Sequence, residues 1–224
     1  MQLLDLLQTA KRGPKYTTRQ LNIFKDQAET PEDETLFYAG DLSLVSKPCV
    51  AIVGSRAATS HGRARATRLA RELVEAGVVI VSGLAKGIDA AAHTSAFDSG
   101  GQTIAVIGTP LSKASPVENA GLQEAIWRDH LLISPFADGS TVQRDNFPHR
   151  NRTMAAISDA TVIVEAADNS GTLYQAVACQ KYGRWLFILK SVVESRAWPQ
   201  RFINQPNTVI LENTEQIFSK LDLR

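Results

Sequence analysis

Short apolar runs recur along the chain from about residue 50, and segments of helical length separate them. Seven of these runs predict strands: Val50–Val53, Val78–Val81, Thr103–Ile107, Leu131–Ile133, Thr161–Val164, Trp185–Leu189 and Thr208–Leu211. Short strands that are apolar almost throughout are typical of a parallel sheet that is covered on both faces. The pattern therefore predicts an α/β fold with a mostly parallel sheet.

The segments between the strands are compatible with helices. In Arg63–Ala76, for example, Leu69, Ala70 and Leu73 fall on one face at helical spacing, and charged residues can point elsewhere. Further helices are predicted at Asp89–Asp98, Asn119–Asp129, Arg150–Ser158, Thr172–Tyr182 and Glu215–Leu221. Strand–helix–strand units repeated in this way give a doubly wound, Rossmann-like sheet.

The first 35 residues differ from the rest. A short helix-compatible opening leads into a polar, charged stretch from Lys11 to Glu34, with breaks at Gly13-Pro14 and Thr30-Pro31. This is too little to hold a core of its own, so the stretch packs on the main domain, mediates contacts or lacks fixed structure. We therefore predict an N-terminal stub, 1–35, and one main domain, 36–224.

Composition limits where an anion could bind and where the protein works. The chain is 44% hydrophobic and 21% charged, with a formal net charge of +1, so any anion site must be a local patch. The two cysteines, Cys49 and Cys179, lie far apart in apolar surroundings, which predicts buried free thiols and a reducing cytoplasm. We see no signal peptide and no apolar stretch of about 18 residues, and so expect a cytoplasmic protein without membrane partners.

Glycine-rich turns follow three of the predicted strands, and in a parallel sheet such turns gather at one edge. The residues that we expect to shape a phosphate site there are Gly54, Ser55 and Arg56, then Gly83, Lys86 and Gly87, and finally Ser170 and Gly171. Glycines let a backbone approach a ligand, and the N–H groups at a helix start attract an anion.

Each of these turns has a second interpretation. Ser55 and the backbone amides could bind a phosphate while Arg56 forks onto it, or the turn could simply expose its arginine to solvent. Lys86, between two glycines, suits an anion contact better than a core position. The turn Asn169–Thr172 could cradle a phosphate or cap the next helix, and both roles would use the same amides.

Two further groups of residues carry possible chemistry. In Phe147–Arg152, Pro148 should hold Phe147 extended, and two arginines spaced i,i+2 diverge, so that either Arg150 or Arg152 faces the cleft while the other braces the fold. A solvated basic turn is the alternative. Asp89 and His93, four residues apart, could form an acid/base pair, or Asp89 could cap a helix with His93 as its structural partner.

Several familiar sites are missing from the sequence. There is no G-x-G-x-x-G fingerprint after the first strand, no P-loop, no G-x-S-x-G elbow and no Cys/His spacing typical of zinc. We therefore expect no cofactor and no metal, assign no catalytic residue, and favour a protein that is not an enzyme.

Several stretches of the chain, taken together, resemble the sequences of the DNA-processing protein A (DprA/Smf) family. The matching stretches are LFYAGD at 36–41, VAIVGSR at 50–56, VSGLAKGIDAAAH at 81–93, GQTIAVIG at 101–108, FPHRNRTMA at 147–155 and EAADNSGTL at 165–173. The resemblance implies a Rossmann-like core, binding of single-stranded DNA, a homodimer, and loading of the recombinase RecA in natural transformation. It also implies that Arg56, Lys86, Arg150 and Arg152 line the nucleic-acid site, with Phe147 as the best candidate for stacking on a base.

Two other functions stay open at this point. The first is binding or hydrolysis of a small nucleotide, for which Asp89, His93 and Glu165 would be the catalytic candidates. The second is a scaffold or partner subunit that uses residues 1–35. Salt-sensitive binding of single-stranded oligonucleotides would separate the DNA-binding hypothesis from both.

Overall fold

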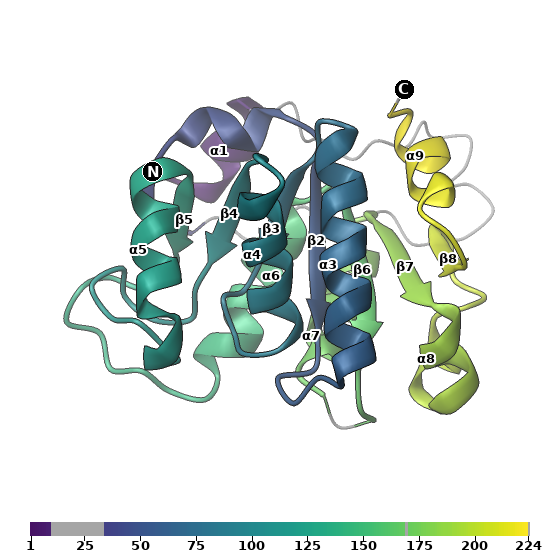
Figure 1. Ribbon diagram of the computed structural model, residues 1–224. Helices are drawn as coiled ribbons and strands as arrows, with labels where there is room; N and C mark the ends of the chain where they lie inside the picture. The colour runs from purple at the N-terminus through teal and green to yellow at the C-terminus, as the bar shows by residue number, and fades with distance from the viewer. Residues whose placement is uncertain (10–33, 169, 224) are drawn as a thin grey trace.

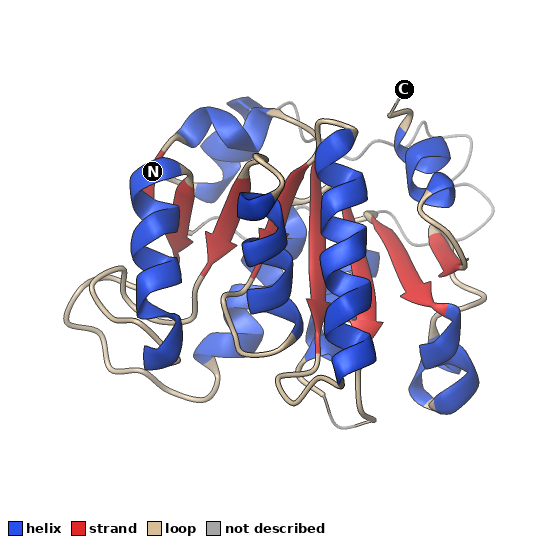
Figure 2. Ribbon diagram, viewed as in Figure 1, coloured by secondary structure: helices blue, strands red, loops and turns tan. Residues whose placement is uncertain are grey.

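The seven predicted strands form one eight-stranded sheet together with a strand that the sequence analysis missed (Figures 1 and 2). The computed structural model describes residues 1–9, 34–168 and 170–223. The strands are β1 (Phe37–Gly40), β2 (Cys49–Gly54), β3 (Val79–Ser82), β4 (Thr103–Val106), β5 (Leu131–Ser134), β6 (Ala160–Glu165), β7 (Trp185–Leu189) and β8 (Thr208–Leu211). Their order in the sheet is β1-β5-β4-β3-β2-β6-β7-β8.

All neighbours in this sheet are parallel except β1, which pairs antiparallel with β5 and places Phe37 opposite Ser134. The doubly wound, mostly parallel α/β fold is therefore confirmed. The edge strand β1 has four residues of alternating exposure, so it lacks the continuous apolar run by which the buried strands were found.

Successive side chains of β2 point into two different cores, one on each face of the sheet. Ala51 and Val53 belong to one core and Val50 and Ile52 to the other, as the period of two requires. The helices α3 (Ser60–Glu75), α4 (Ile88–Asp98) and α5 (Ala120–Asp129) cover the face that is in front in Figure 1, and α6 (Asn146–Ile157) and α7 (Thr172–Lys181) cover the face behind. After β7 come α8 (Lys190–Ser195), which was not predicted, and then β8 and α9 (Glu215–Leu221).

The start of the chain is part of the main core. Leu3, Leu6 and Leu7 of α1 (Leu3–Thr9) are buried in the same core as the inner face of β2. The predicted breaks at Gly13-Pro14 and Thr30-Pro31 lie outside the described residues. The division of the chain at residue 35 stays a prediction.

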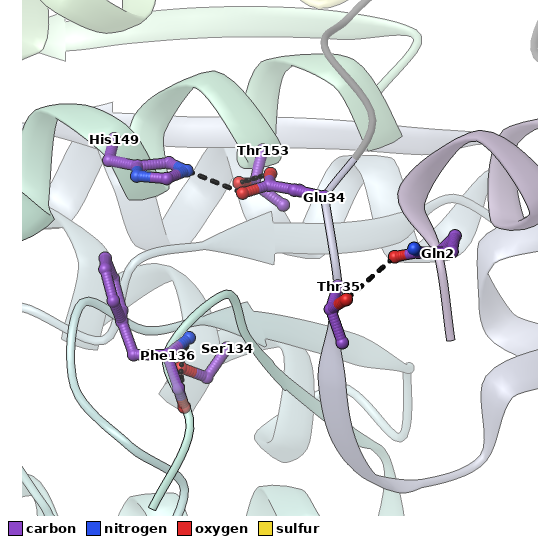
Figure 3. Close-up of polar contacts among 7 residues, drawn as sticks. All are labelled: Gln2, Glu34, Thr35, Ser134, Phe136, His149 and Thr153. Atoms are coloured by element: carbon purple, nitrogen blue, oxygen red, sulfur yellow. Dashed lines mark hydrogen bonds and ion pairs between the residues drawn. The ribbon is translucent and has the colours of Figure 1, made fainter. Parts of the chain in front are cut away.

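Glu34 ties the segment before β1 to α6 (Figure 3). Its Oε2 lies 2.5 Å from Nε2 of His149, and its Oε1 accepts a hydrogen bond of 2.6 Å from the hydroxyl of Thr153. Next to it, the hydroxyl of Thr35 donates to Oε1 of Gln2 at 2.9 Å. Glu34 thus joins the residues before β1 to α6, and the contact of Thr35 with Gln2 joins them to the start of the chain.

The expectation that Phe147 is extended is wrong. Helix α6 begins at Asn146, four residues earlier than predicted, and Phe147 and Pro148 lie in its first turn. An N–H in the first turn has no acceptor within the helix, so the proline loses nothing there. The preference of a residue before a proline for extended backbone is therefore overridden here by the helical first turn of α6.

Both cysteines are free and buried, as predicted. Over the part of the chain that the structure describes, no helix is both long enough and apolar enough to cross a membrane.

Candidate functional site

The order of the strands predicts where a ligand can enter. From β2 the chain proceeds outward through β3, β4 and β5, and then returns to place β6 on the other side of β2. The connections that leave β2 and β6 therefore run to opposite sides, and this separation opens a crevice at the carboxyl ends of the two strands.

A cleft of about 890 Å³ occupies this position. Of the residues that the sequence analysis singled out, those that line it are Gly54, Ser55, Arg56, Asp89, Phe147, Arg150, Ser170 and Gly171. Four segments far apart in the sequence thus meet at one site: the turn after β2, the turn between β3 and α4, the first turns of α6 and the start of α7.

Arg56 and Phe147 form the wall nearest to β2. The guanidinium carbon of Arg56 lies 5.0 Å from the centroid of the Phe147 ring, within the range of a cation–π contact. Arg56 is exposed, and Phe147 is half-buried against Gly108. The ring therefore supports the guanidinium from one side and leaves its charge accessible to a ligand.

Arg150 has a different environment, because it is buried at the floor of the cleft. One nitrogen of its guanidinium donates to the carbonyl oxygens of Gly83 and Val106, which lie just beyond β3 and at the end of β4. Burial lowers the pKa of Arg150 to about 10, and nearby Asp89 acts in the opposite direction. The side chain stays charged at neutral pH and braces the ends of two strands.

Asp89 lies beneath the same floor. Its Oδ2 accepts a hydrogen bond of 3.3 Å from the amide of Ala85. Burial raises the pKa of its carboxyl, while the charge of Arg150 and the amides of Ala85 and Gly83 oppose that shift. The two buried charges therefore depend on each other.

His93 lies deeper in α4 and is fully buried. Its Nδ1 is 2.6 Å from the hydroxyl of Thr103, which in turn donates to the carbonyl of Ile80. Burial lowers the pKa of His93 to about 3, far from the value that suits a general acid or base near pH 7. Its contacts fit a structural role, with Thr103 as its partner in place of Asp89, and α4 has no side-chain cap.

Five of the predicted residues do not line the cleft: Gly83, Lys86, Gly87, His93 and Arg152. Lys86 is exposed, and its Nζ lies 2.6 Å from Oε1 of Glu118. Arg152 is exposed on α6, two residues beyond the buried Arg150, so the two arginines diverge as their spacing predicted. Arg152 lies outside the cleft. Arg150 lines the cleft and also braces the fold, so one arginine has both of the roles that the prediction divided between the two.

The two glycines of the second turn act by allowing close approach. Gly87 has a φ of +80°, and a Cβ there would collide with the carbonyl oxygen of Ser55. A Cβ at Gly83 would collide with the guanidinium of Arg150. Both positions thus shape the cleft without lining it.

The backbone amides that were expected to bind phosphate are partly occupied. The N–H of Ser55 donates to the carbonyl of Glu165 at 2.7 Å, and the N–H of Thr172 donates to Oγ of Ser170 at 3.2 Å. The second contact is a local serine turn before α7, whose N-cap, Gly171, has no side-chain capping hydrogen bond; Asn169 lies outside the described residues. Among the described residues that line the cleft, the exposed cations that could contact an anion are Arg56 and Arg144.

Arg144 is the cation that the sequence analysis missed. It lines the cleft, is exposed and lies in the turn before α6, outside every motif. Only the position of this turn over the switch point reveals its role. Tyr174 of α7, Asn151 and Gln175 also line the cleft and were not predicted.

Glu165, a catalytic candidate for nucleotide hydrolysis, has a structural contact. Its Oε2 accepts a hydrogen bond of 2.6 Å from the hydroxyl of Thr59, which caps α3 by accepting from the amide of Gly62. Among the described residues, no group of three or more His, Cys, Asp or Glu side chains could hold a metal ion.

A second cleft, of about 380 Å³, lies between α3 and the ends of β7 and β8. Two charge pairs lie within it, Arg68 with Glu72 and Lys190 with Glu212 at 2.7 Å, and the exposed Arg65 donates to the hydroxyl of Ser191. The cleft at the switch point is larger and is lined by two exposed arginines, Arg56 and Arg144.

The fold and this site define a doubly wound α/β protein with an arginine-lined cleft at the topological switch point. The chain belongs to the DNA recombination-mediator protein A family, whose pattern it matches over residues 13–222.

Individual relatives agree with this assignment. The DNA processing protein DprA of Streptococcus pneumoniae is 43% identical over 154 residues, which cover 69% of this chain and 54% of the relative. Its crystal structure superimposes with a TM-score of 0.73 and 35% identity, over 83% of this chain and 65% of that chain. The structure of DNA processing protein A from Helicobacter pylori gives a TM-score of 0.70 and 28% identity, over 94% and 95% of the two chains.

The chain spans about half the length of the curated relatives that it matches most strongly. The shared part is the sheet and its cleft, so the family assignment rests on the region that contains the candidate site.

Proposed function

We propose that this chain binds single-stranded DNA in the cleft at the switch point and acts in DNA uptake or recombination. The observation that carries the proposal is the pair of exposed arginines, Arg56 and Arg144, on the lining of a large open cleft. Among the described residues that line it, the one carboxylate is Asp89, which lies next to the buried charge of Arg150.

The related protein supports the choice of ligand. The structure of the Helicobacter pylori protein concerns its mode of binding single-stranded DNA, and that protein matches this chain over 94% of its length. The family consists of mediators of DNA recombination. A net charge of +1 is compatible with this function because two exposed arginines lie together on the lining of one cleft and form a local positive site.

The physical basis of binding would be contacts to phosphate. A guanidinium fits two phosphate oxygens at once, and each such contact releases counterions from the strand. Affinity should therefore fall steeply as salt rises, and the effect should depend on Arg56 and Arg144 together with any further cation that reaches the strand. Lys86 would have to leave Glu118 in order to contribute.

The proposal is tested by fluorescence anisotropy with a labelled single-stranded oligonucleotide. We expect Arg56→Ala and Arg144→Ala each to weaken binding about 10-fold, since each removes a charge-assisted contact. Arg71→Ala is the matched control, because Arg71 is an exposed arginine on α3 outside the cleft. Equal affinities for all four proteins would refute the site, and displacement of the strand by a mononucleotide would instead favour a small-nucleotide function.

The proposal extends to partners and location on the strength of the family resemblance. We include a homodimer, a contact with RecA and a cytoplasmic location. Sedimentation of the protein alone and with RecA would test the first two, and a monomer that does not associate with RecA would remove them while leaving DNA binding intact.

A further inference from the structure

Tyr174 is an aromatic residue that the fold leaves uncovered. It is the third residue of α7 and is 57% exposed, whereas Thr172 and Gln175 on either side of it are buried. Ring contacts join several aromatic pairs elsewhere in the described chain, but Tyr174 is in none of them. Other exposed aromatic residues occur at Tyr38 and Trp127, so the exposure of Tyr174 becomes informative through its place in the molecule.

The position of this ring is as important as its exposure. Tyr174 lines the same cleft as Arg56, Arg144 and Phe147, on the side formed by α7. Phe147 has Arg56 over its ring, so one of its faces is already in use. Tyr174 is thus the aromatic group of this cleft, among the described residues, that is mainly open to solvent.

The arginines provide contacts to the phosphates of a single strand but not to its bases. Guanidinium groups bind its phosphates, but its bases are unpaired and lose their contact with water most favourably on a flat aromatic surface. The bases of a duplex are already stacked and cannot use such a surface without unpairing. An exposed ring beside the phosphate-binding arginines therefore favours single-stranded over double-stranded DNA.

We propose that Tyr174 is a stacking platform for one base of the bound strand. The proposal rests on the proposed function and adds to it the contact that recognises an unpaired base. Stacking requires the ring but not the hydroxyl, and it is tolerant of sequence because every base has an aromatic face. The sequence analysis gives Phe147 as the best candidate for stacking, and the structure adds Tyr174 as a second aromatic residue on the lining of the cleft.

The test compares two labelled strands of equal length: an ordinary oligonucleotide, and an abasic one that keeps every phosphate. We expect the wild-type protein to bind the ordinary strand more tightly. Tyr174→Ala should weaken binding of the ordinary strand roughly 5- to 100-fold and leave the abasic strand nearly unchanged. Tyr174→Phe should bind both strands like the wild type.

Two controls use exposed residues outside the cleft. Val177 is 50% exposed one turn further along α7, and Trp127 is 45% exposed on α5; neither lines the cleft. Val177→Ala and Trp127→Ala should therefore bind both strands with unchanged affinity. They separate a specific effect of the Tyr174 ring from a general effect of removing exposed apolar surface.

The outcomes distinguish a failure of stacking on Tyr174 from a failure of DNA binding. If the wild type binds but Tyr174→Ala binds both strands equally well, or loses affinity for both by the same factor, stacking on Tyr174 is refuted and DNA binding stands. If the wild type binds neither strand at low salt, the proposed function fails, and the stacking role fails with it.

Discussion

The guanidinium of Arg56 lies 5.0 Å from the centre of the Phe147 ring, so the turn after β2 and the first turn of α6 meet over the cleft. The two residues are 91 positions apart in the sequence, and the contact exists only because β6 inserts next to β2. It keeps the charge of Arg56 in place without neutralising it, which is what an anion-binding arginine needs.

We predict that Phe147→Leu weakens binding of a single strand about 2- to 5-fold, since a cation–π contact at a partly exposed site contributes about 0.5–1 kcal/mol. Phe147→Tyr keeps the ring and should bind like the wild type. Anisotropy titrations of the two variants measure the difference. Equal affinity of the leucine variant and the wild type would show that the ring has no part in positioning Arg56.

Arg150 should matter chiefly for stability. Arg150→Met removes its hydrogen bonds to the carbonyls of Gly83 and Val106 and leaves Asp89 buried without its neighbouring cation. Leaving a buried acceptor without its donor costs about 1–3 kcal/mol in free energy of unfolding, and two carbonyls lose their donor here. Arg152→Ala, two positions away and exposed, should change it by less than about 0.5 kcal/mol. Urea unfolding of both variants checks the contrast, and similar midpoints would contradict the bracing role.

The lowered pKa of His93 predicts how the free energy of unfolding depends on pH. Its pKa in the folded protein is about 3, below the ordinary value of 6.5 for histidine, because burial disfavours the charged imidazole. Between these values the unfolded chain binds the proton and the folded protein does not, so the contribution is complete above pH 6.5 and is lost as pH falls. At pH 5 the loss is about 2 kcal/mol, from about 1.4 kcal/mol per pH unit.

The variant His93→Asn isolates this effect. It should be less stable overall, since it alters the contact with Thr103, but its free energy of unfolding should fall less between pH 7 and pH 5. Urea titrations at the two pH values provide the measurement. An identical pH dependence in the wild type and the variant would mean that His93 is not the group responsible.

The contacts of Glu34 in Figure 3 predict a coupling between the N-terminal segment and α6. Glu34→Ala removes the acceptor of the Thr153 hydroxyl and the partner of His149, and should lower the free energy of unfolding by about 1–2 kcal/mol. A double-mutant cycle with His149→Ala apportions the effect. Additive changes would show that the two side chains do not interact in solution.

Much of the fold could be predicted because its strands are buried on both faces. Continuous apolar runs such as Val78–Val81 are short and rich in β-branched residues, which indicates strands. All seven runs became strands. β1 was missed because it is a short edge strand with alternating exposure. Helix α8 was missed because Lys190–Ser195 has only six residues and one fully buried side chain, so it carries no periodic pattern.

The site was predictable to the extent that it follows from topology. The turns after β2 and β6 could be expected to meet, and Arg56 and Gly171 do line one cleft. Lys86 could not be placed, because its side chain turns outward to a glutamate, Glu118, that no motif contains. Arg144 and Tyr174 could not be found either, since nothing in their local sequence marks an exposed residue as facing a cleft.

The central claim is that the cleft holds the phosphates of a single strand, and salt dependence tests it most directly. The logarithm of the binding constant should fall linearly with the logarithm of salt concentration, with a slope of about −0.7 for each phosphate contact on a single strand. The Arg56→Ala/Arg144→Ala protein should have a slope shallower by about 1.4, and the Arg71→Ala protein should match the wild type. A double variant that keeps the slope of the wild type would contradict the account.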